Sequence, residues 1–201
     1  DIDVLEAASK CGVTYYRTNW FKYSENQSME DSIMGYNGQV RSLAIMNKEL
    51  GLVGCYQNHA GMHIGASFWE IHQLVKDADP AGFGVQYDIR HAMVEGANSW
   101  KNGLRLLRPF IKTIVLKDFK WKKINGTWQV INVPIGQGLV DFDGYFKLLK
   151  KYKLAPPVSL HLEYDLGGAE KGLRNISVDR QVVYNAIKKD LTKVQELWRL
   201  A

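Results

Sequence analysis

The feature that most constrains the fold of this chain is a steady alternation of short apolar strands with amphipathic helices. Runs rich in β-branched and aromatic residues predict strands at 13–19, 52–59, 83–88, 113–118 and 158–163. Apolar residues at helical spacing predict helices at 2–10, 28–50, 67–77, 99–110, 142–152 and 178–200. Apolar strands separated by helices are typical of a parallel sheet covered on both faces, so we expect a doubly wound sheet or a (β/α) barrel.

One segment, 121–133, interrupts the alternation. Asn125-Gly126 lies there between two alternating runs and predicts a β-hairpin with a type I′ turn, an excursion outside the barrel. No linker or low-complexity stretch divides the chain, so we expect residues 1–201 to form a single domain. A complete barrel has eight strands and about 250 residues. If the fold is a barrel, the chain is short by about three βα units at its N-terminus, so we expect the C-terminal portion of a (β/α)8 TIM barrel, about its last five βα units.

Composition and charge exclude several classes of protein. The chain has 201 residues, 46% of them hydrophobic and 23% charged, as in an ordinary globular domain. Its formal charge is +5, but the basic residues are interleaved with acids, and only Lys120, Lys122 and Lys123 cluster, around Trp121. We therefore expect no nucleic-acid partner. No apolar run approaches the roughly 20 residues that span a bilayer, so we expect no membrane partner.

The cysteines say little about the cellular compartment. Cys11 and Cys55 have neither metal-site nor disulfide-framework spacing, so each is predicted to be a small buried hydrophobic residue. A cytoplasmic location is favoured. A periplasmic or secreted location stays open, because the first barrel units are expected to be missing from this sequence.

Polar residues follow every predicted strand. In barrels and open parallel sheets the functional site lies at the carboxyl ends of the strands, so we expect the site at this rim. A period of two along the last strand puts His161, Glu163 and Asp165 on one face. The strand ends carry, in chain order, Tyr15-Tyr16-Arg17-Thr18-Asn19, Gln57-Asn58-His59, Asp88-Ile89-Arg90-His91, Lys117-Asp118 and His161-Leu162-Glu163-Tyr164-Asp165.

Two acids of this rim, Asp88 and Glu163, are candidates for metal binding. An Asp and a Glu with histidines nearby suit a divalent cation, which polarises a hydroxyl or carbonyl while a carboxylate or imidazole moves a proton. The alternative interpretation is that they form ion pairs with Arg17, Arg90 or Lys117.

Two other features of the rim are less specific. Trp20, beside the first strand end, stacks on a sugar ring in one interpretation and caps the barrel mouth in the other. The loop 167–172 contains three glycines after the last strand, where barrels often build an anion site from backbone N–H groups. Both interpretations stay open.

At these positions the sequence resembles the sugar phosphate isomerase/epimerase family, which has the xylose isomerase-like TIM barrel of the AP endonuclease 2-type superfamily. The resemblance covers nearly the whole chain and implies that its strands are the barrel's fourth to eighth. The family motifs are a Glu-Asn-His or His-Asn-His strand end, Asp-x-x-His, His-x-Lys-Asp, a Gly-x-Gly-x-x-Asp-Phe turn and a late Glu. The residues here are Gln57-Asn58-His59, Asp88-Ile89-Arg90-His91, Val115-Leu116-Lys117-Asp118, Gly136-Gln137-Gly138-Leu139-Val140-Asp141-Phe142 and Glu163.

The resemblance also implies a metal held by Glu, Asp, His and Glu, with the two Glu as paired acid and base. Gln57 and Val115 stand at the first and third of these positions, so only Asp88 and Glu163 match. A neutral amide cannot abstract a proton, and valine cannot ligate a metal.

A metal ion is therefore one of two alternatives. In the first, a divalent ion (Mn, Mg, Co or Zn) binds with the vacancies filled by His59, His91 or His161. In the second, the cavity has no metal and Lys117 is its local cation.

The leading hypothesis is a divergent sugar or sugar phosphate isomerase/epimerase with acid–base chemistry at the rim, in which Glu163 or His161 is the base. Lys117 with Arg17 then stabilises an enediolate-like anion. The alternatives are a lyase, dehydratase or hydrolase acting on an oxidised sugar, and a non-catalytic sugar-binding barrel. The expected partner is a small-molecule carbohydrate, and a homo-oligomer is a further possibility. The residues assigned are Glu163, His161, Lys117 and His91 to catalysis, Arg17, Gln57, His59, Asp118 and Trp20 to substrate binding, and Asp88 and Glu163 to a metal.

Overall fold

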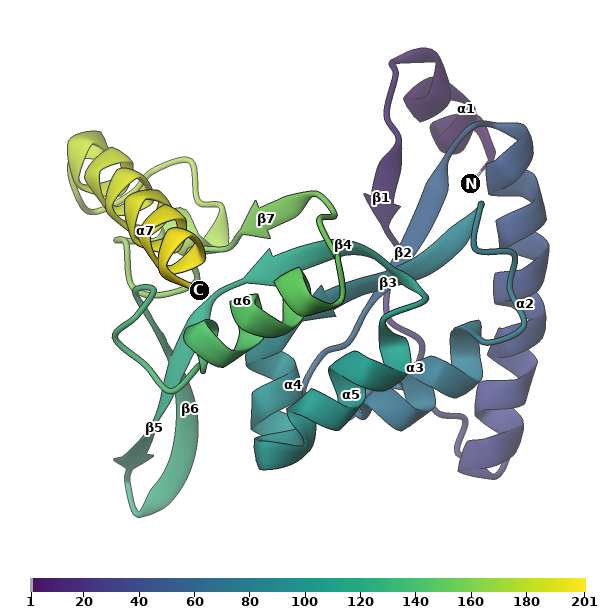
Figure 1. The fold of residues 1–201 in the computed structure, drawn as a ribbon, viewed down its shortest axis with the longest axis horizontal. Helices are drawn as coiled ribbons and strands as arrows, with labels where there is room; N and C mark the ends of the chain where they lie inside the picture. Colours follow the sequence, from purple (N-terminus) through teal and green to yellow (C-terminus); the bar gives the residue numbers. More distant parts are fainter. Residues whose placement is uncertain (1) are drawn as a thin grey trace. The chain divides into compact units, whose positions relative to one another are not determined.

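The computed structural model describes residues 2–201, and helices and strands alternate along them (Figure 1). Asp1, the first residue of the predicted domain, lies outside the described residues. In chain order the elements are α1 (Ile2–Lys10), β1 (Tyr15–Arg17), α2 (Met29–Glu49), β2 (Val53–Gln57), α3 (Phe68–Val75), β3 (Phe83–Asp88), α4 (Ile89–Gly96), η1 (Ala97–Ser99), α5 (Trp100–Leu107), β4 (Ile111–Leu116), β5 (Asp118–Ile124), β6 (Thr127–Val133), α6 (Phe142–Lys151), β7 (Val158–Leu160), η2 (Ala169–Lys171) and α7 (Arg180–Leu200).

The helix boundaries follow capping residues. The hydroxyls of Ser28 and Ser67 accept hydrogen bonds from backbone N–H groups in the first turns of α2 and α3, which confirms both predicted starts. Gly51, the predicted stop of α2, has a φ of +69°, a conformation that glycine adopts without strain.

Helix α4 was not predicted. The segment Asp88–His91 was interpreted as the end of a strand, but the strand ends at Asp88 and a helix begins at Ile89. The Asp88 carboxylate accepts a hydrogen bond from the backbone N–H of His91 and so caps this helix. Asp88 is therefore both the last residue of β3 and the N-cap of α4.

The chain divides into two compact units, which we call unit 1 and unit 2. Unit 1 extends to Ile114 and includes Pro156–Val158, and unit 2 comprises Val115–Ala155 and Ser159–Ala201. Within residues 2–201, one sheet has five strands in the order β1-β2-β3-β4-β7, and β5 pairs with β6 in a second sheet. The pairs β1–β2 and β2–β3 are parallel, as predicted, with Arg17 opposite Cys55 and Gln57 opposite Gln86.

In unit 1, α2 packs closely on the start of β3. A Cβ placed on Gly82 would lie 1.9 Å from the carbonyl oxygen of Ala44, so only glycine allows this approach. Asn47 of α2 donates from Nδ2 to the carbonyl of Gly82 at 2.9 Å and accepts from the Tyr16 hydroxyl at 2.9 Å. One helix residue thus joins β1 to the segment before β3.

In unit 2, β5 and β6 form an antiparallel ribbon (Figure 1). Asn125 and Gly126 have φ values of +50° and +83°, as a type I′ turn requires. The predicted hairpin is confirmed, although it begins at Asp118 rather than Trp121.

Two further predictions were wrong. Cys11 is exposed, because it lies in the turn after α1 rather than inside the helix, whereas Cys55 is buried as predicted. The last strand ends at Leu160, so His161 and Glu163 belong to the segment that follows it.

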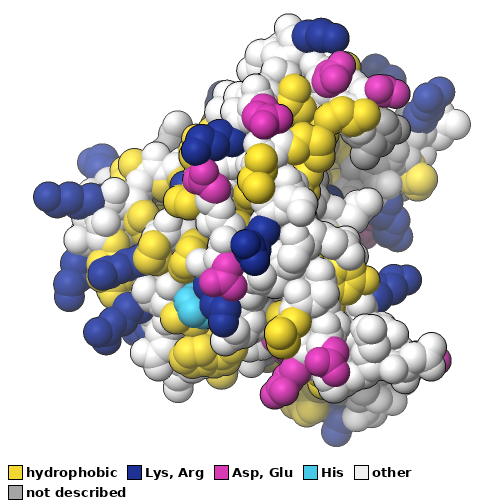
Figure 2. All heavy atoms as spheres, turned by 90° about the vertical axis from the view of Figure 1, so that its right-hand side faces the viewer, with side chains coloured by type: hydrophobic (Ala, Val, Ile, Leu, Met, Phe, Trp, Pro, Cys, Tyr) yellow, Lys and Arg dark blue, Asp and Glu magenta, His cyan; other side chains and the backbone are white. Residues whose placement is uncertain are grey.

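On the face drawn in Figure 2, Lys and Arg side chains lie among Asp and Glu side chains. None of the helices within residues 2–201 has the length and apolar character needed to cross a bilayer.

Candidate functional site

The ends of three neighbouring strands in unit 1 carry a chain of side-chain hydrogen bonds. Arg17, Gln57 and Asp88 are the last residues of β1, β2 and β3. Arg17 donates from Nη1 to Gln57 Oε1 at 3.0 Å, and Gln57 donates from Nε2 to Asp88 Oδ2 at 2.8 Å. The Gln57 amide therefore links a guanidinium to a buried carboxylate, with both of its ends occupied.

The position of Asp88 is fixed from several directions. Its carboxylate is buried and also accepts from the backbone N–H of His91 at 3.2 Å. The Asn58 side chain accepts from the Asp88 N–H at 2.8 Å and donates to the Asp88 carbonyl at 2.9 Å. Asn58 was not among the predicted site residues, although it stands within the Gln57-Asn58-His59 motif.

His91 is buried next to Asp88. Its Nδ1 accepts from the Ala60 backbone N–H at 3.1 Å and from Nη1 of Arg90 at 2.9 Å. Since Nδ1 is an acceptor, the hydrogen-bond network assigns the ring proton to Nε2, which lies 3.7 Å from Asp88 Oδ2. The imidazole therefore lies against the Asp88 carboxylate, while the backbone N–H of His91 makes the hydrogen bond to it.

An aromatic cluster, Trp20, His59 and His63, lies beside the Arg17 side chain. The Trp20 ring centroid is 4.4 Å from that of His59 and 5.8 Å from that of His63. The Arg17 guanidinium lies 4.9 Å from the Trp20 ring centroid, and Trp20 Nε1 donates to the carbonyl of Gln57 at 3.3 Å. Ring faces next to a cation suit a sugar ring that carries oxygen substituents. His63 was not predicted, although it lies in the loop after His59.

In unit 2, Lys117 and Glu163 form a two-pronged ion pair. Lys117 Nζ donates to Oε1 and Oε2 of Glu163, both at 3.0 Å. The Lys117 side chain is only 3% exposed, and that of Glu163 is 38% exposed. Asn132 of β6 adds weaker contacts from Nδ2, at 3.3 Å to the Glu163 carbonyl and 3.4 Å to Oε2. A buried ammonium requires such a partner.

His161 and Glu163 form a carboxylate–imidazole dyad. His161 Nδ1 lies 3.3 Å from Glu163 Oε1, and the imidazole is 24% exposed. Burial alone would raise the pKa of Glu163, but the hydrogen bond to His161 and the charge of Lys117 outweigh burial and lower this pKa from 4.5 to about 2. If Nδ1 donates to Glu163, Nε2 of His161 is the ring's acceptor.

Two other acids of the predicted rim bind backbone groups. The buried Asp118 carboxylate accepts hydrogen bonds from four backbone N–H groups, those of Phe119, Gly136, Gly138 and Val140. This geometry favours a structural role for Asp118 over substrate binding. Asp165 accepts from the N–H of Gly167 at 3.0 Å. Of the three residues expected on one face, His161 and Glu163 are in contact with each other.

The glycine-rich loop uses its donors internally. Glu170 Oε2 accepts from the N–H groups of Leu166 at 3.0 Å and Gly168 at 2.9 Å. These donors are therefore engaged by the chain's own carboxylate rather than arranged for an external anion.

The donor set does not fit the divalent metal that the family resemblance implies. Among residues 2–201 there is no group of three or more His, Cys, Asp or Glu side chains that could hold a metal ion. Val115 is buried in β4 and offers no ligand atom. The carbonyl oxygen of Gln57 accepts from Arg17, and Lys117 contacts both oxygens of Glu163. The oxygen atoms that would have to bind a metal ion are thus already in contact with Arg17, with the Gln57 amide or with Lys117.

Parallel strands whose carboxyl ends carry titratable side chains define an α/β protein. The chain belongs to the xylose isomerase-like TIM barrel family, whose model matches residues 2–177. This confirms the expected family and fold class. No curated protein sequence matched the chain.

Solved structures of the same fold include enzymes of different activities. D-Psicose 3-epimerase from Clostridium cellulolyticum H10, with D-tagatose, has a TM-score of 0.73 and 15% identity, covering 98% of this chain and 68% of the other. The probable 3-DHS dehydratase AsbF from Bacillus anthracis has a TM-score of 0.67 and 14% identity, covering 87% and 70%. The IOLI protein with a binding zinc atom has a TM-score of 0.72 and 17% identity, covering 96% and 66%. At these identities the likeness concerns the fold alone.

Proposed function

We propose that this chain is a sugar-converting enzyme of the isomerase or epimerase type, in which the His161–Glu163 dyad moves a proton without a metal ion. The observation that carries the proposal is the ordered series Lys117, Glu163, His161, with contacts of 3.0 Å and 3.3 Å. The first residue of this series, Lys117, is a buried cation, and the last, His161, has a partly exposed imidazole. The epimerases among the solved structures of this fold support a sugar substrate.

Of the two candidate bases, the contacts favour His161. A carboxylate whose pKa is lowered to about 2 is a poor acceptor for a proton on carbon, so Glu163 serves to orient His161. His161 Nε2 removes the proton next to a carbonyl group, which leaves an enediolate and an imidazolium. Glu163 stabilises the imidazolium, as a carboxylate does in other dyads. Return of the proton to carbon, on either face or at the adjacent position, completes the epimerisation or isomerisation.

Lys117 acts in this proposal as a positioning residue. Its ammonium contacts both oxygens of Glu163 and is almost completely buried, so it fixes the plane of the carboxylate that holds His161. Removing it is expected to lower the rate without changing which carbon exchanges.

Separately, and for unit 1 taken by itself, we propose that Trp20 and His59 bind a sugar face and that Arg17 binds its oxygen substituents. Gln57 holds Arg17 at 3.0 Å and is in turn anchored on Asp88. His91 then contributes through its backbone N–H, which donates to the Asp88 carboxylate at 3.2 Å, rather than by transferring a proton.

Proton exchange at carbon tests the proposal directly. The protein is incubated with D-psicose, D-tagatose or D-fructose in D2O containing a chelator, and deuterium incorporation is followed by NMR. His161→Gln is expected to lower exchange by about 100-fold or more, the usual contribution of a general base. The matched control His72→Gln, on α3, should keep the wild-type rate. No exchange by the wild-type protein, or exchange that appears only on addition of Mn²⁺, would contradict the proposal.

A second candidate is a sugar-binding protein without turnover, and the neutral amide of Gln57 favours it, since the resemblance implies an acid at that position. It predicts thermal stabilisation by a ketose without deuterium incorporation. Mass spectrometry of the same reactions detects a dehydratase, because its product lacks one water.

A further inference from the structure

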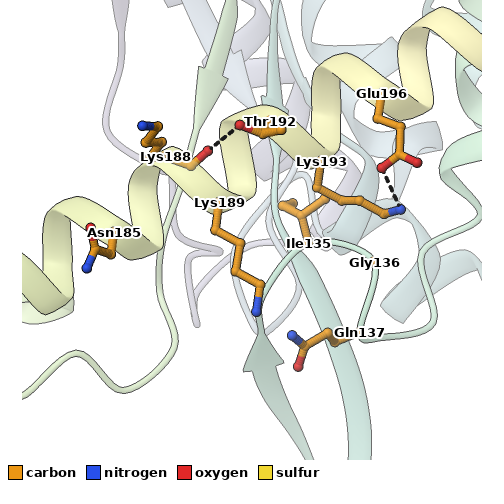
Figure 3. Close-up of a pocket in the computed structure, with 9 residues that line it drawn as sticks. All are labelled: Ile135, Gly136, Gln137, Asn185, Lys188, Lys189, Thr192, Lys193 and Glu196. Carbon is orange, nitrogen blue, oxygen red and sulfur yellow. Dashed lines mark hydrogen bonds and ion pairs between the residues drawn. The ribbon is translucent and has the colours of Figure 1, made fainter.

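A second candidate binding site lies in unit 2, in a pocket of about 540 Å³ between the loop 135–137 and one face of α7 (Figure 3). We call it the α7 pocket. Neither His161 nor Glu163 contributes to it, so it is independent of the proposed function. Its lining residues are Ile135, Gly136, Gln137, Asn185, Lys188, Lys189, Thr192, Lys193 and Glu196.

The residues of the helix face in this pocket are all polar, and the carbon stems of their side chains contribute to its mostly apolar surface. Its residues recur at the spacing of one helix face, at positions 185, 188, 189, 192, 193 and 196. Three of them are lysines and one is a glutamate. Lys189 and Lys193 stand four residues apart, a spacing at which like charges repel, by about 0.2–0.5 kcal/mol in isolated helices. On α6 the same spacing joins opposite charges, Lys147 and Asp143, at 2.8 Å.

The loop side of the pocket is shaped to receive a lysine stem. Gly136 has a φ of +80°, and a Cβ on it would lie 3.2 Å from Cε of Lys193. The Gly136 N–H donates to Asp118 Oδ2 at 2.9 Å, which fixes this part of the loop. The adjacent Gln137 is exposed and leaves its amide for a ligand.

The charges in the pocket are only partly compensated. Lys193 Nζ lies 3.0 Å from Glu196, whereas Lys189 extends from the helix toward Gln137 (Figure 3). Within the described part of the chain, no ion pair joins Lys188 or Lys189 to an acid. Asp190, the nearest acid in sequence, is buried and accepts from the Tyr164 hydroxyl at 3.0 Å, so it interacts with the charge of Lys189 without forming an ion pair with it. The pocket therefore attracts anions.

We propose that the α7 pocket binds a small phosphomonoester, with its phosphate on Lys189 and Lys193 and its hydroxyl groups on Gln137 and Asn185. A compact dianion offsets the repulsion between the lysines, and amides recognise hydroxyl groups. The volume lies within the range of about 300–1,000 Å³ typical of small-molecule sites. A nucleic acid is less suited, because the three lysines lie within two turns of one helix face rather than along an extended track.

Calorimetric titration of the full chain with glycerol 3-phosphate, glycerol and inorganic phosphate tests this site. We expect glycerol 3-phosphate to bind and glycerol not to bind. Lys189→Gln should weaken phosphate-ester binding by about tenfold, since it removes a charge-assisted hydrogen bond. The matched control is Lys151→Gln at the end of α6, which removes the same charge from an exposed helix position and should leave the affinity unchanged. Asn185→Ala should weaken glycerol 3-phosphate binding and spare inorganic phosphate.

Three results would overturn the site. The first is no saturable binding of either phosphate compound by the wild-type protein. The second is an equal loss in Lys189→Gln and Lys151→Gln, which indicates net charge alone. The third is tighter binding of a DNA duplex through the same lysines, with an affinity that falls steeply as salt is added. Because ketose proton exchange is measured separately, failure here leaves the proposed function untouched.

Discussion

Lys117 Nζ lies 3.0 Å from both carboxylate oxygens of Glu163, so the charge of a side chain that is 3% exposed is neutralised by one that still reaches solvent. Glu163→Gln should therefore lower the free energy of unfolding by about 1–3 kcal/mol, the cost of a buried polar group left without its partner. Lys117→Met removes the buried charge itself and should cost less. Urea denaturation measures both, with the exposed Lys147→Met as control. Equal effects of the three variants would contradict a special role for this pair.

The pH dependence of stability follows from the same contact. Burial opposes the shift, but His161 and Lys117 lower the pKa of Glu163 to about 2, below its ordinary value of 4.5. A lowered native pKa stabilises the fold fully above about pH 4.5, and this contribution is lost as the pH falls toward 2. The free energy of unfolding should decrease over this window, and less steeply in Glu163→Gln. Solvent screening at this partly exposed carboxylate reduces the size of the effect. Parallel pH profiles of the two proteins would contradict the assignment.

The close approach of α2 to the start of β3 predicts opposite effects of two glycine substitutions. Gly82→Ala places a Cβ 1.9 Å from the backbone oxygen of Ala44, so backbone must move, and the variant should be strongly destabilised. Gly38→Ala on α2 meets no atom within 4 Å and should stabilise the helix by about 0.5–1 kcal/mol. Thermal unfolding of both variants checks the packing of unit 1. A small effect at Gly82 would show that α2 packs differently.

The fold was largely predictable from the sequence because its signals are local. Apolar runs gave the strands, and capping residues such as Ser28 and Gly51 gave the helix limits. Helix α4 was missed because Asp88 was interpreted only as a strand residue, whereas its carboxylate also caps the helix that follows. A local sequence pattern does not show whether a side chain at the end of a strand also caps the helix that follows.

The candidate site was predictable in its residue types but not in its pairings. Strand ends supplied Gln57 and Glu163, yet the sequence does not show that the Gln57 amide spans Arg17 and Asp88. Such partners depend on strand register and side-chain rotamers across elements far apart in the chain. His63 was missed for a related reason, since only the folded loop places its ring against Trp20.

Gln57 also allows a test of the metal-free interpretation. Gln57→Glu replaces the amide donor 2.8 Å from Asp88 with a second carboxylate, near His91 Nε2, which lies 3.7 Å from Asp88. Two carboxylates and an imidazole suit a divalent ion, so Mn²⁺ or Co²⁺ should raise the melting temperature of this variant and bind in calorimetry. The wild-type protein should show neither response. Gln73→Glu, at an exposed position of α3, adds the same charge and serves as control.

An equal response of the wild-type protein to Mn²⁺ would contradict this interpretation. It would mean that the Gln57 amide does not keep the ion from Asp88, and the metal-free interpretation of this part of unit 1 would then lose its basis.

Trp20 connects the aromatic cluster to sugar binding, and its removal tests that role. The centroid of the indole ring lies 4.4 Å from that of His59, and the Arg17 guanidinium lies 4.9 Å from the indole centroid. Trp20→Ala therefore removes a ring face for stacking and also the ring that contacts the Arg17 guanidinium. Ketose affinity measured by calorimetry should fall by about tenfold, the upper range for one aromatic contact. Trp69→Ala, on the exposed side of α3, removes an indole of the same size and should bind as the wild type does. If both variants lose affinity equally, or if Trp20→Ala binds normally while its fold is intact by circular dichroism, the cluster is not the sugar-binding surface.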